Sequence, residues 1–292
     1  MLIIGCSHAT EFAKKLARKT KSTYSELHIE KFPDSETHLR FQKDVKGQIV
    51  VLVQSFYQSK DYNINDNVME VIFAAATARE LGAKKVILAA PYFSYFRQDK
   101  RFKPGACVSI KVIGKLFNKY FDQILTIDPH LHRVHSMSEV FNIKAKHLTS
   151  NSLIAKYIKK NIKDPVIIGP DAESYQWARK IAESINVDAA ILKKTRYSSR
   201  KVKVKLSKKI ELKNKNLVIV DDIISTGHTI LETIKDMKKL KPKNIYCICI
   251  HGVFVEGALE KIRNHAKVIS CNTIPNKVSK IDVSSLIAEE LV

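Results

Sequence analysis

Short apolar runs alternate along the chain with stretches in which apolar residues recur at helical spacing. The runs are rich in β-branched residues and predict buried strands at 2–6, 49–54, 85–90, 123–128, 166–170, 189–193, 217–222, 245–251 and 268–271. The intervening stretches predict helices near 12–17 and over 68–81, 108–117, 153–158, 175–185, 230–240 and 257–262. This alternation predicts an α/β fold whose sheets are mainly parallel and flanked by helices.

The two halves of the chain repeat one pattern. Each half has buried strands that end in acidic residues, such as Asp128 in the first half and Asp171 in the second. We therefore expect two similar α/β domains, formed by residues 1–147 and 148–292. Basic and apolar residues alternate over 200–209, and this period of two predicts one half of a β-hairpin.

Residues 217–230 carry the most informative pattern. A buried strand leads into two carboxylates, a run of small polar residues and a helix. The polar positions are Asp221, Asp222, Ser225, Thr226, Gly227, His228 and Thr229. Ligands of open α/β sheets bind beyond the carboxyl ends of the strands, and a helix N-terminus attracts anions. Carboxylates suit sugar hydroxyls or a divalent metal, so the pattern favours a ribose phosphate over an ordinary capped turn.

Two further patches in the first half follow predicted strands. Arg97, Gln98 and Asp99 come after an aromatic-rich strand exit, and arginine binds phosphate oxygens through two parallel hydrogen bonds. His130 lies two residues after Asp128 in a segment with three histidines. A structural zinc site needs four ligands and no cysteine is near, so contact with a magnesium–nucleotide complex is favoured over zinc.

Three other segments offer polar side chains that a ligand could use. Phe32 with Asp34 and Glu36 combines a stacking surface with hydrogen-bond acceptors, as a purine requires, although an ordinary turn explains it equally well. Asp171 follows a strand and a Gly-Pro pair. Lys194 and Arg196 lie at a strand end, where two cations could steady a transferring phosphoryl group, or could simply be solvated.

Composition narrows the class of protein. Lys and Arg number 50 against 29 Asp and Glu, giving a formal charge of +21 that would attract nucleic acid, but the charge is spread along the chain and we expect no nucleic-acid partner. No apolar run approaches the roughly 20 residues of a membrane span. Five cysteines without a C-x-x-C pair indicate a reduced, cytoplasmic protein.

These residues together resemble the ribose-phosphate diphosphokinases, with an archaeal-type pattern. The matching segments are 32–36, 64–70, 95–100, 128–130, 170–171, 220–229, 251–254 and 272–275, in the family's order. The resemblance implies two phosphoribosyltransferase-like domains. It also implies transfer of the diphosphoryl group of ATP to the 1-hydroxyl of ribose 5-phosphate, giving 5-phosphoribosyl 1-diphosphate and AMP with Mg²⁺ as cofactor.

The resemblance assigns a role to each candidate residue. It places the segment from Ser225 to Thr229 around the sugar 5-phosphate and Asp221 with Asp222 on the ribose hydroxyls. It assigns ATP binding to Phe32, Asp34, Glu36, Arg97, Gln98 and Asp99, metal contact to His130 and Asp171, and transition-state contact to Lys194 and Arg196. It implies a homo-oligomer built from dimers, with the Phe32 segment reaching a neighbouring subunit.

The chain departs from the family pattern at His228, where a small residue is usual, so the phosphate loop carries a ring that could face solvent or add a donor to the 5-phosphate. Two other functions stay open. A phosphoribosyltransferase shares the 220–229 motif but needs no ATP-side residues, and a non-catalytic relative would bind ligand without turning it over.

Overall fold

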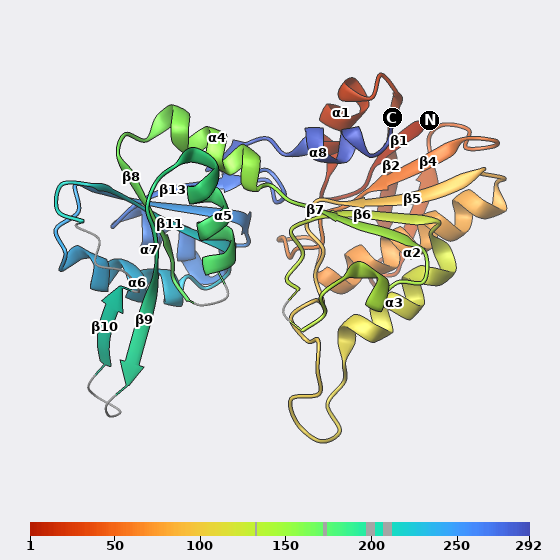
Figure 1. The fold of residues 1–292 in the computed structure, drawn as a ribbon. Helices are drawn as coiled ribbons and strands as arrows, with labels where there is room; N and C mark the ends of the chain where they lie inside the picture. Colours follow the sequence, from red (N-terminus) through yellow and green to blue (C-terminus); the bar gives the residue numbers. More distant parts are fainter. Residues whose placement is uncertain (132, 172–173, 197–201, 207–211) are drawn as a thin grey trace. The chain divides into compact units, whose positions relative to one another are not determined.

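A computed structural model describes the chain except residues 132, 172–173, 197–201 and 207–211, and describes side chains outside 192–211. The described residues form two compact units (Figure 1). Unit 1 consists of 1–149, 273–275 and 283–292, and unit 2 of 150–272 and 276–282. Among the helices described, none is long and apolar enough to cross a bilayer.

Unit 1 is a seven-stranded sheet of order β3-β2-β1-β4-β5-β6-β7, parallel except for the β2–β3 pair. Its elements are β1 (Leu2–Gly5), α1 (Thr10–Lys19), β2 (Thr23–Lys31), β3 (Thr37–Phe41), β4 (Ile49–Val53), α2 (Ile64–Glu80), β5 (Lys85–Ala90), α3 (Ser109–Tyr120), β6 (Gln123–Ile127), the 3₁₀ helix η1 (Met137–Glu139), β7 (Lys144–Leu148) and α8 (Ser284–Glu289). Helices α1 and α8 pack together, while α2 and α3 cover the face that holds the main apolar cluster.

Unit 2 repeats this sheet with the order β10-β9-β8-β11-β12-β13-β14, parallel except for the β9–β10 pair. Its elements are α4 (Asn151–Asn161), β8 (Pro165–Gly169), α5 (Tyr175–Ile185), β9 (Ala189–Arg196), β10 (Val202–Leu206), β11 (Asn216–Ile224), α6 (His228–Lys238), β12 (Asn244–Gly252), the 3₁₀ helix η2 (Val255–Gly257), α7 (Ala258–Arg263), β13 (Lys267–Cys271) and β14 (Ser279–Ile281).

The two sheets have the same topology, since each strand of unit 2 occupies the place of the strand seven earlier in unit 1. This confirms the prediction of two similar units with mainly parallel sheets. The hairpin predicted over 200–209 is confirmed for 202–206, because β10 pairs with β9 in antiparallel register, and the rest of that range lies outside the described residues.

The helix that follows the last strand of each sheet belongs to the other unit. Helix α4 follows β7 but packs on α5, and α8 follows β14 but packs on α1, as Figure 1 shows for α8. The chain therefore passes from unit 1 to unit 2 at Thr149–Ser150 and returns at its C-terminal end. The division expected from the sequence, 1–147 and 148–292, lies near this crossing and does not include the return.

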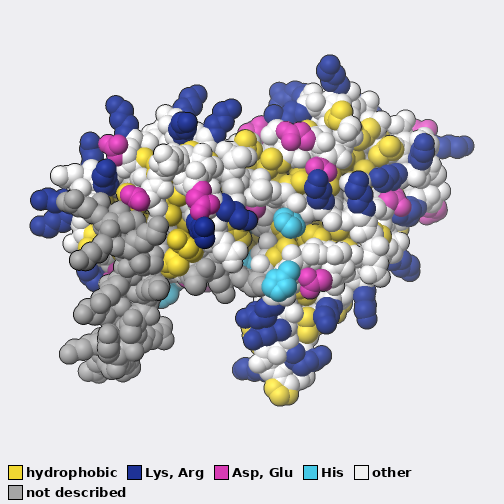
Figure 2. All heavy atoms as spheres, in the orientation of Figure 1, with side chains coloured by type: hydrophobic (Ala, Val, Ile, Leu, Met, Phe, Trp, Pro, Cys, Tyr) yellow, Lys and Arg dark blue, Asp and Glu magenta, His cyan; other side chains and the backbone are white. Residues whose placement is uncertain are grey.

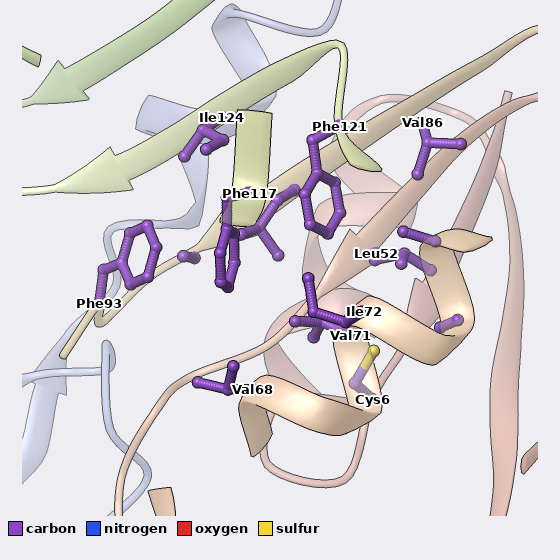
Figure 3. Packing of buried hydrophobic residues seen from close by; sticks show 14 of the residues in the cluster. Cys6, Leu52, Val68, Val71, Ile72, Val86, Phe93, Phe117, Phe121 and Ile124 are labelled. Atoms are coloured by element: carbon purple, nitrogen blue, oxygen red, sulfur yellow. The ribbon is translucent and has the colours of Figure 1, made fainter. Parts of the chain in front are cut away.

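Figure 3 shows how the main cluster of unit 1 is built. Strand residues that point to one face, such as Leu52 and Val86, meet apolar residues of α2 and the rings of Phe117 and Phe121 on and after α3. Phe117 and Phe121 stack with their ring centres 5.4 Å apart. Dense packing of this kind fixes the strand ends, and with them the loops that carry polar side chains.

Candidate functional site

The carboxyl edge of the unit 2 sheet gathers three of the predicted carboxylates. Strand β11 continues to Ile224, two residues beyond the predicted end, so Asp221 and Asp222 lie within the strand rather than after it. Asp222 is buried, and its Oδ1 accepts a hydrogen bond from the N–H of Ile223 at 2.8 Å. Asp171 lies at the end of the neighbouring strand β8 and is exposed.

These carboxylates repel one another. Burial raises the pKa of Asp221 well above its usual value, and the nearby charges of Asp222 and then Asp171 raise it further. Ser174 holds Asp171 in place, because its N–H and its hydroxyl each donate to Asp171 Oδ1 at 2.8 Å. A ligand that donates hydrogen bonds, or a cation, would relieve this repulsion.

The loop after β11 leads directly into helix α6. Helix α6 begins at His228 after Gly227, whose φ is 74°, and among the described residues no side chain caps it and no acid lies in its first turn. A Cβ at Gly227 would lie 2.9 Å from Ile262 Cδ1, the end of a side chain that can shift, so the positive φ is what requires glycine here. The first N–H groups of α6 are therefore available to an anion.

His228 lies on the outside of this helix. Its side chain is 80% exposed, and its Nε2 lies 3.4 Å from Glu232 Oε1 one turn further along. The ring therefore extends along α6. The departure from the family pattern at this position leaves the backbone N–H groups of the first turn accessible.

The equivalent helix start in unit 1 is filled by the chain's own groups. Helix α2 follows β4 as α6 follows β11, and Asn63 Oδ1 accepts the N–H groups of Asn65 and Asp66. The Asp66 carboxylate in turn accepts from the N–H of Asn63 and from Lys31 Nζ at 2.8 Å. This capping box occupies the position that an anion would need. Of the two similar units, unit 2 therefore has the open anion site.

Unit 1 also contains a buried polar network that sequence reasoning missed. Glu70 accepts from the N–H and the hydroxyl of Ser7 at 2.8 and 2.6 Å. Gln54 donates to Ser7 Oγ and accepts the N–H of His8. His8 meets Asn67 Oδ1 at 3.2 Å. The sequence does contain a signal for this network, because Asn67 and Glu70 are polar residues on a helix whose other inward positions are apolar.

Comparison with known proteins agrees with this arrangement. Residues 1–120 match the family model of the N-terminal domain of ribose phosphate pyrophosphokinase, and residues 136–287 match the phosphoribosyl transferase domain. The ribose-phosphate pyrophosphokinase of Methanothermobacter thermautotrophicus is 35% identical over 99% of both chains. That of Saccharolobus solfataricus is 34% identical over 100% of both. The chain belongs to the ribose-phosphate pyrophosphokinase family.

A solved member of this family has the same fold. The phosphoribosylpyrophosphate synthetase of Mycobacterium smegmatis superposes with a TM-score of 0.85 over 99% of this chain and 97% of the other, at 23% identity. The fold expected from the resemblance is thereby confirmed.

The predicted ATP-side segment 97–99 meets the loop that follows His130 in unit 1. The buried Asp99 accepts from Arg133, at 3.1 Å from its N–H and 3.0 Å from its Nη1. Asp99 therefore fixes the position of Arg133, a half-exposed residue that sequence reasoning did not single out. Arg97 is exposed and Gln98 is partly exposed, so both can reach a ligand.

Backbone strain marks the exits of several strands. Tyr95 follows β5 with a φ of 69°, Asp128 follows β6 with a φ of 35°, and Phe254 follows β12 with a φ of 47°. Such left-handed conformations are costly for residues other than glycine and gather at functional sites. His130 lies partly buried two residues beyond Asp128, in agreement with the predicted position of this patch at a strand exit.

The hairpin between β2 and β3 carries the predicted adenine-binding residues. Phe32, Asp34 and Glu36 are all exposed, and Phe32 is 53% exposed although it is aromatic. The N–H of Phe32 donates to the carbonyl of Glu36, which closes the turn. The ring contacts His38 edge-on at 5.8 Å and leaves much of its surface open to a partner.

The remaining predicted positions are described in part. Lys194 and Arg196 lie on β9, where their backbones pair with Val204 and Val202 of β10, but their side chains fall outside the described residues. Among the side chains that the structure describes, no group of three or more metal-ligating residues surrounds a common point. The roles assigned to individual residues therefore remain predictions.

Proposed function

We propose that this protein transfers the diphosphoryl group of ATP to the 1-hydroxyl of ribose 5-phosphate, giving 5-phosphoribosyl 1-diphosphate and AMP. The observation that carries the proposal is the uncapped start of α6 beside Asp221 and Asp222, in a chain whose full-length relatives are ribose-phosphate pyrophosphokinases. An anion-binding helix start next to paired carboxylates suits a sugar that bears a phosphate.

The reaction is a displacement at phosphorus. The 1-oxygen of ribose 5-phosphate attacks the β-phosphorus of ATP, and the bond from that phosphorus to the α–β bridging oxygen breaks. AMP leaves with that oxygen, and the hydroxyl proton passes to solvent. Such transfers depend on alignment and charge neutralisation more than on covalent catalysis.

Residues of unit 2 hold the acceptor. The N–H groups at the start of α6, with Ser225, Thr226 and Thr229, bind the 5-phosphate. Asp221 and Asp222 accept hydrogen bonds from the ribose hydroxyls, which offset the cost of burying two neighbouring carboxylates. The strand fixes both carboxylates before the substrate arrives, so the site is preorganised.

The other predicted residues act on the donor. Arg97 and Gln98 contact ATP, and Asp99 positions Arg133 toward the same ligand. Phe32, with Asp34 and Glu36, receives the adenine ring bound to a neighbouring subunit, which accounts for the exposed aromatic side chain. We accordingly propose an oligomer built from dimers. Lys194 and Arg196 neutralise the transferring group.

Magnesium fits the chemistry of the available donors. Asp171 and the Asp221–Asp222 pair offer hard oxygen ligands, and the negative charges of Asp222 and Asp171 add to burial in raising the pKa of Asp221. Mg²⁺ is commonly held by one or two carboxylates together with substrate phosphates, so a complete protein cage is not required. Asp171 and His130 would contact it, and when bound the ion supplies charge neutralisation at the phosphates.

The activity is tested with purified protein, ATP, ribose 5-phosphate and Mg²⁺, with nucleotide products separated by chromatography. We expect AMP to form only when ribose 5-phosphate is present. A phosphoribosyltransferase would instead need 5-phosphoribosyl 1-diphosphate and a base, and a non-catalytic relative would form no AMP. Asp222→Asn is the matched control, because it keeps the size of the side chain and removes its charge.

A further inference from the structure

The amino edge of the unit 2 sheet, opposite the edge that carries Asp221 and Asp222, holds a basic surface pocket. The pocket has a volume of about 410 Å³ and lies where α6 and α7 end and β12 and β13 begin. Its basic lining residues are Lys238, Lys241, Lys243, Arg263, His265 and Lys267. No aspartate or glutamate is among the described residues that line it.

The equivalent position in unit 1 can be compared with this pocket, because the two sheets have the same topology. Strand pairing gives Gln123 of β6 the same place as Lys267 of β13, so Asp122 is the equivalent of Ala266. In unit 1 Asp122 pairs with Arg79 at 2.9 Å and also accepts the N–H of Val86. Unit 2 has Ala266 in place of this carboxylate, among the cations that line the pocket.

The known contacts do not neutralise the pocket. Lys238 Nζ meets His265 Nδ1 at 3.2 Å, and Lys267 lies over the ring of Tyr246 at 5.4 Å. Within the described part of the chain, Lys241 and Lys243 have no ion pair with a carboxylate. Lysine and arginine side chains are spread over the face of the protein drawn in Figure 2, and the net charge of +21 gives a further reason for like charges to repel here.

The helix dipoles stabilise only some of the cations that line the pocket. Lys238 and Arg263 lie in the last turns of α6 and α7, where positive charge is favourable. Lys241 and Lys243 lie in the loop before β12, and Lys267 begins β13. These three lysines line the pocket although they lie outside the last turn of any helix, where a positive charge would be favourable.

We propose that this pocket binds a condensed phosphate, either inorganic tripolyphosphate or the triphosphate tail of a nucleotide. Several cations around a concave surface match a short chain of phosphates, and the volume is within the usual range for small ligands. The described lining has no phenylalanine, tyrosine or tryptophan on which a base could stack, and its His265 already meets Lys238, so the phosphate chain is the recognised part. The site is separate from the proposed catalytic edge.

The test compares two triple variants of equal charge. One replaces the pocket lysines through Lys241→Gln, Lys243→Gln and Lys267→Gln. The control replaces exposed lysines of α4 through Lys156→Gln, Lys159→Gln and Lys160→Gln. Calorimetry with tripolyphosphate should show an affinity loss of at least about tenfold for the pocket variant and less than about twofold for the control.

Hydrogen exchange locates the bound ligand and separates its sources. We expect tripolyphosphate to protect residues 241–245 and 263–268 of the wild-type protein, and protection by ATP as well would identify a nucleotide tail as a sufficient ligand. Absence of protection there, or equal affinity losses in both triple variants, would overturn the proposal. Protection by a short RNA but not by tripolyphosphate would also overturn it, in favour of a nucleic-acid surface.

A single substitution provides an independent variant. Ala266→Asp introduces into unit 2 the carboxylate that unit 1 has at the equivalent position, and Ala266 is only partly buried. It should weaken tripolyphosphate binding several-fold while the unfolding temperature changes little. An unchanged affinity in the folded variant would count against the pocket as the binding site.

Discussion

Replacing Glu70 by glutamine should stabilise the protein at alkaline pH and destabilise it at acidic pH. Burial raises the pKa of Glu70 from 4.5 to about 7, although hydrogen bonds from Ser7 act in the opposite direction. Since the folded pKa exceeds the unfolded one, its contribution to stability is complete below pH 4.5 and is lost as pH rises to about 7. At pH 8 the buried carboxylate is ionised at a cost of about 3 kcal/mol.

Glutamine at position 70 removes the cost of ionising a buried carboxylate, and it also removes one hydrogen bond. Its amide oxygen can still accept the N–H of Ser7, but the hydroxyl of Ser7 loses its acceptor, at about 1 kcal/mol. The net expectation is a gain in the free energy of unfolding of about 2 kcal/mol at pH 8 and a loss of about 1 kcal/mol at pH 4.5. Glu80→Gln, on the exposed face of the same helix, should show neither effect.

The assay is scanning calorimetry at both pH values, with tryptophan fluorescence as an internal reference. The one tryptophan, Trp177, lies on α5 of unit 2, so its transition reports on the unit that the substitution leaves unchanged. A Glu70→Gln variant that is destabilised equally at both pH values would refute this account. It would mean that the carboxylate is ionised and well compensated in the folded state.

Three further predictions concern the proposed site. Asp222→Asn should weaken ribose 5-phosphate binding at least about tenfold in calorimetry, because a buried acceptor for the sugar hydroxyls loses its charge; unchanged affinity would exclude the role. Lys194→Ala and Arg196→Ala should each lower kcat with little change in that affinity, and a rise in KM alone would contradict a role in the transition state. Gly227→Ala should destabilise the protein by about 1 kcal/mol and weaken sugar-phosphate binding, since a φ of 74° is strained for any residue with a Cβ and the Ile262 side chain would have to shift; normal binding would contradict the loop's role.

Local sequence patterns were sufficient for the central strands and the phosphate loop. Strands such as β5, predicted at 85–90 and found at Lys85–Ala90, are buried on both faces and therefore form continuous apolar runs. The loop at Gly227 could be predicted because its strand, carboxylates, glycine and helix follow one another in the chain. Such features depend on neighbouring residues only.

Features at the sheet edges and between distant residues could not be predicted in this way. Strands β3 and β7 are partly exposed and carry charged residues, so their patterns resemble those of loops. The return of α8 to unit 1 depends on packing against α1, far away in the sequence. The same holds for Glu70 and Ser7, whose contact joins positions 63 residues apart.

The most direct test of the central claim follows the phosphorus atoms of ATP. ATP labelled at the β-phosphorus is incubated with ribose 5-phosphate, Mg²⁺ and the protein, and the products are separated. Transfer of both terminal phosphates predicts that the label appears in the sugar 1-diphosphate together with an equal amount of AMP. Label retained in ADP would show transfer of a single phosphate, and would contradict the assignment of this protein as a diphosphokinase.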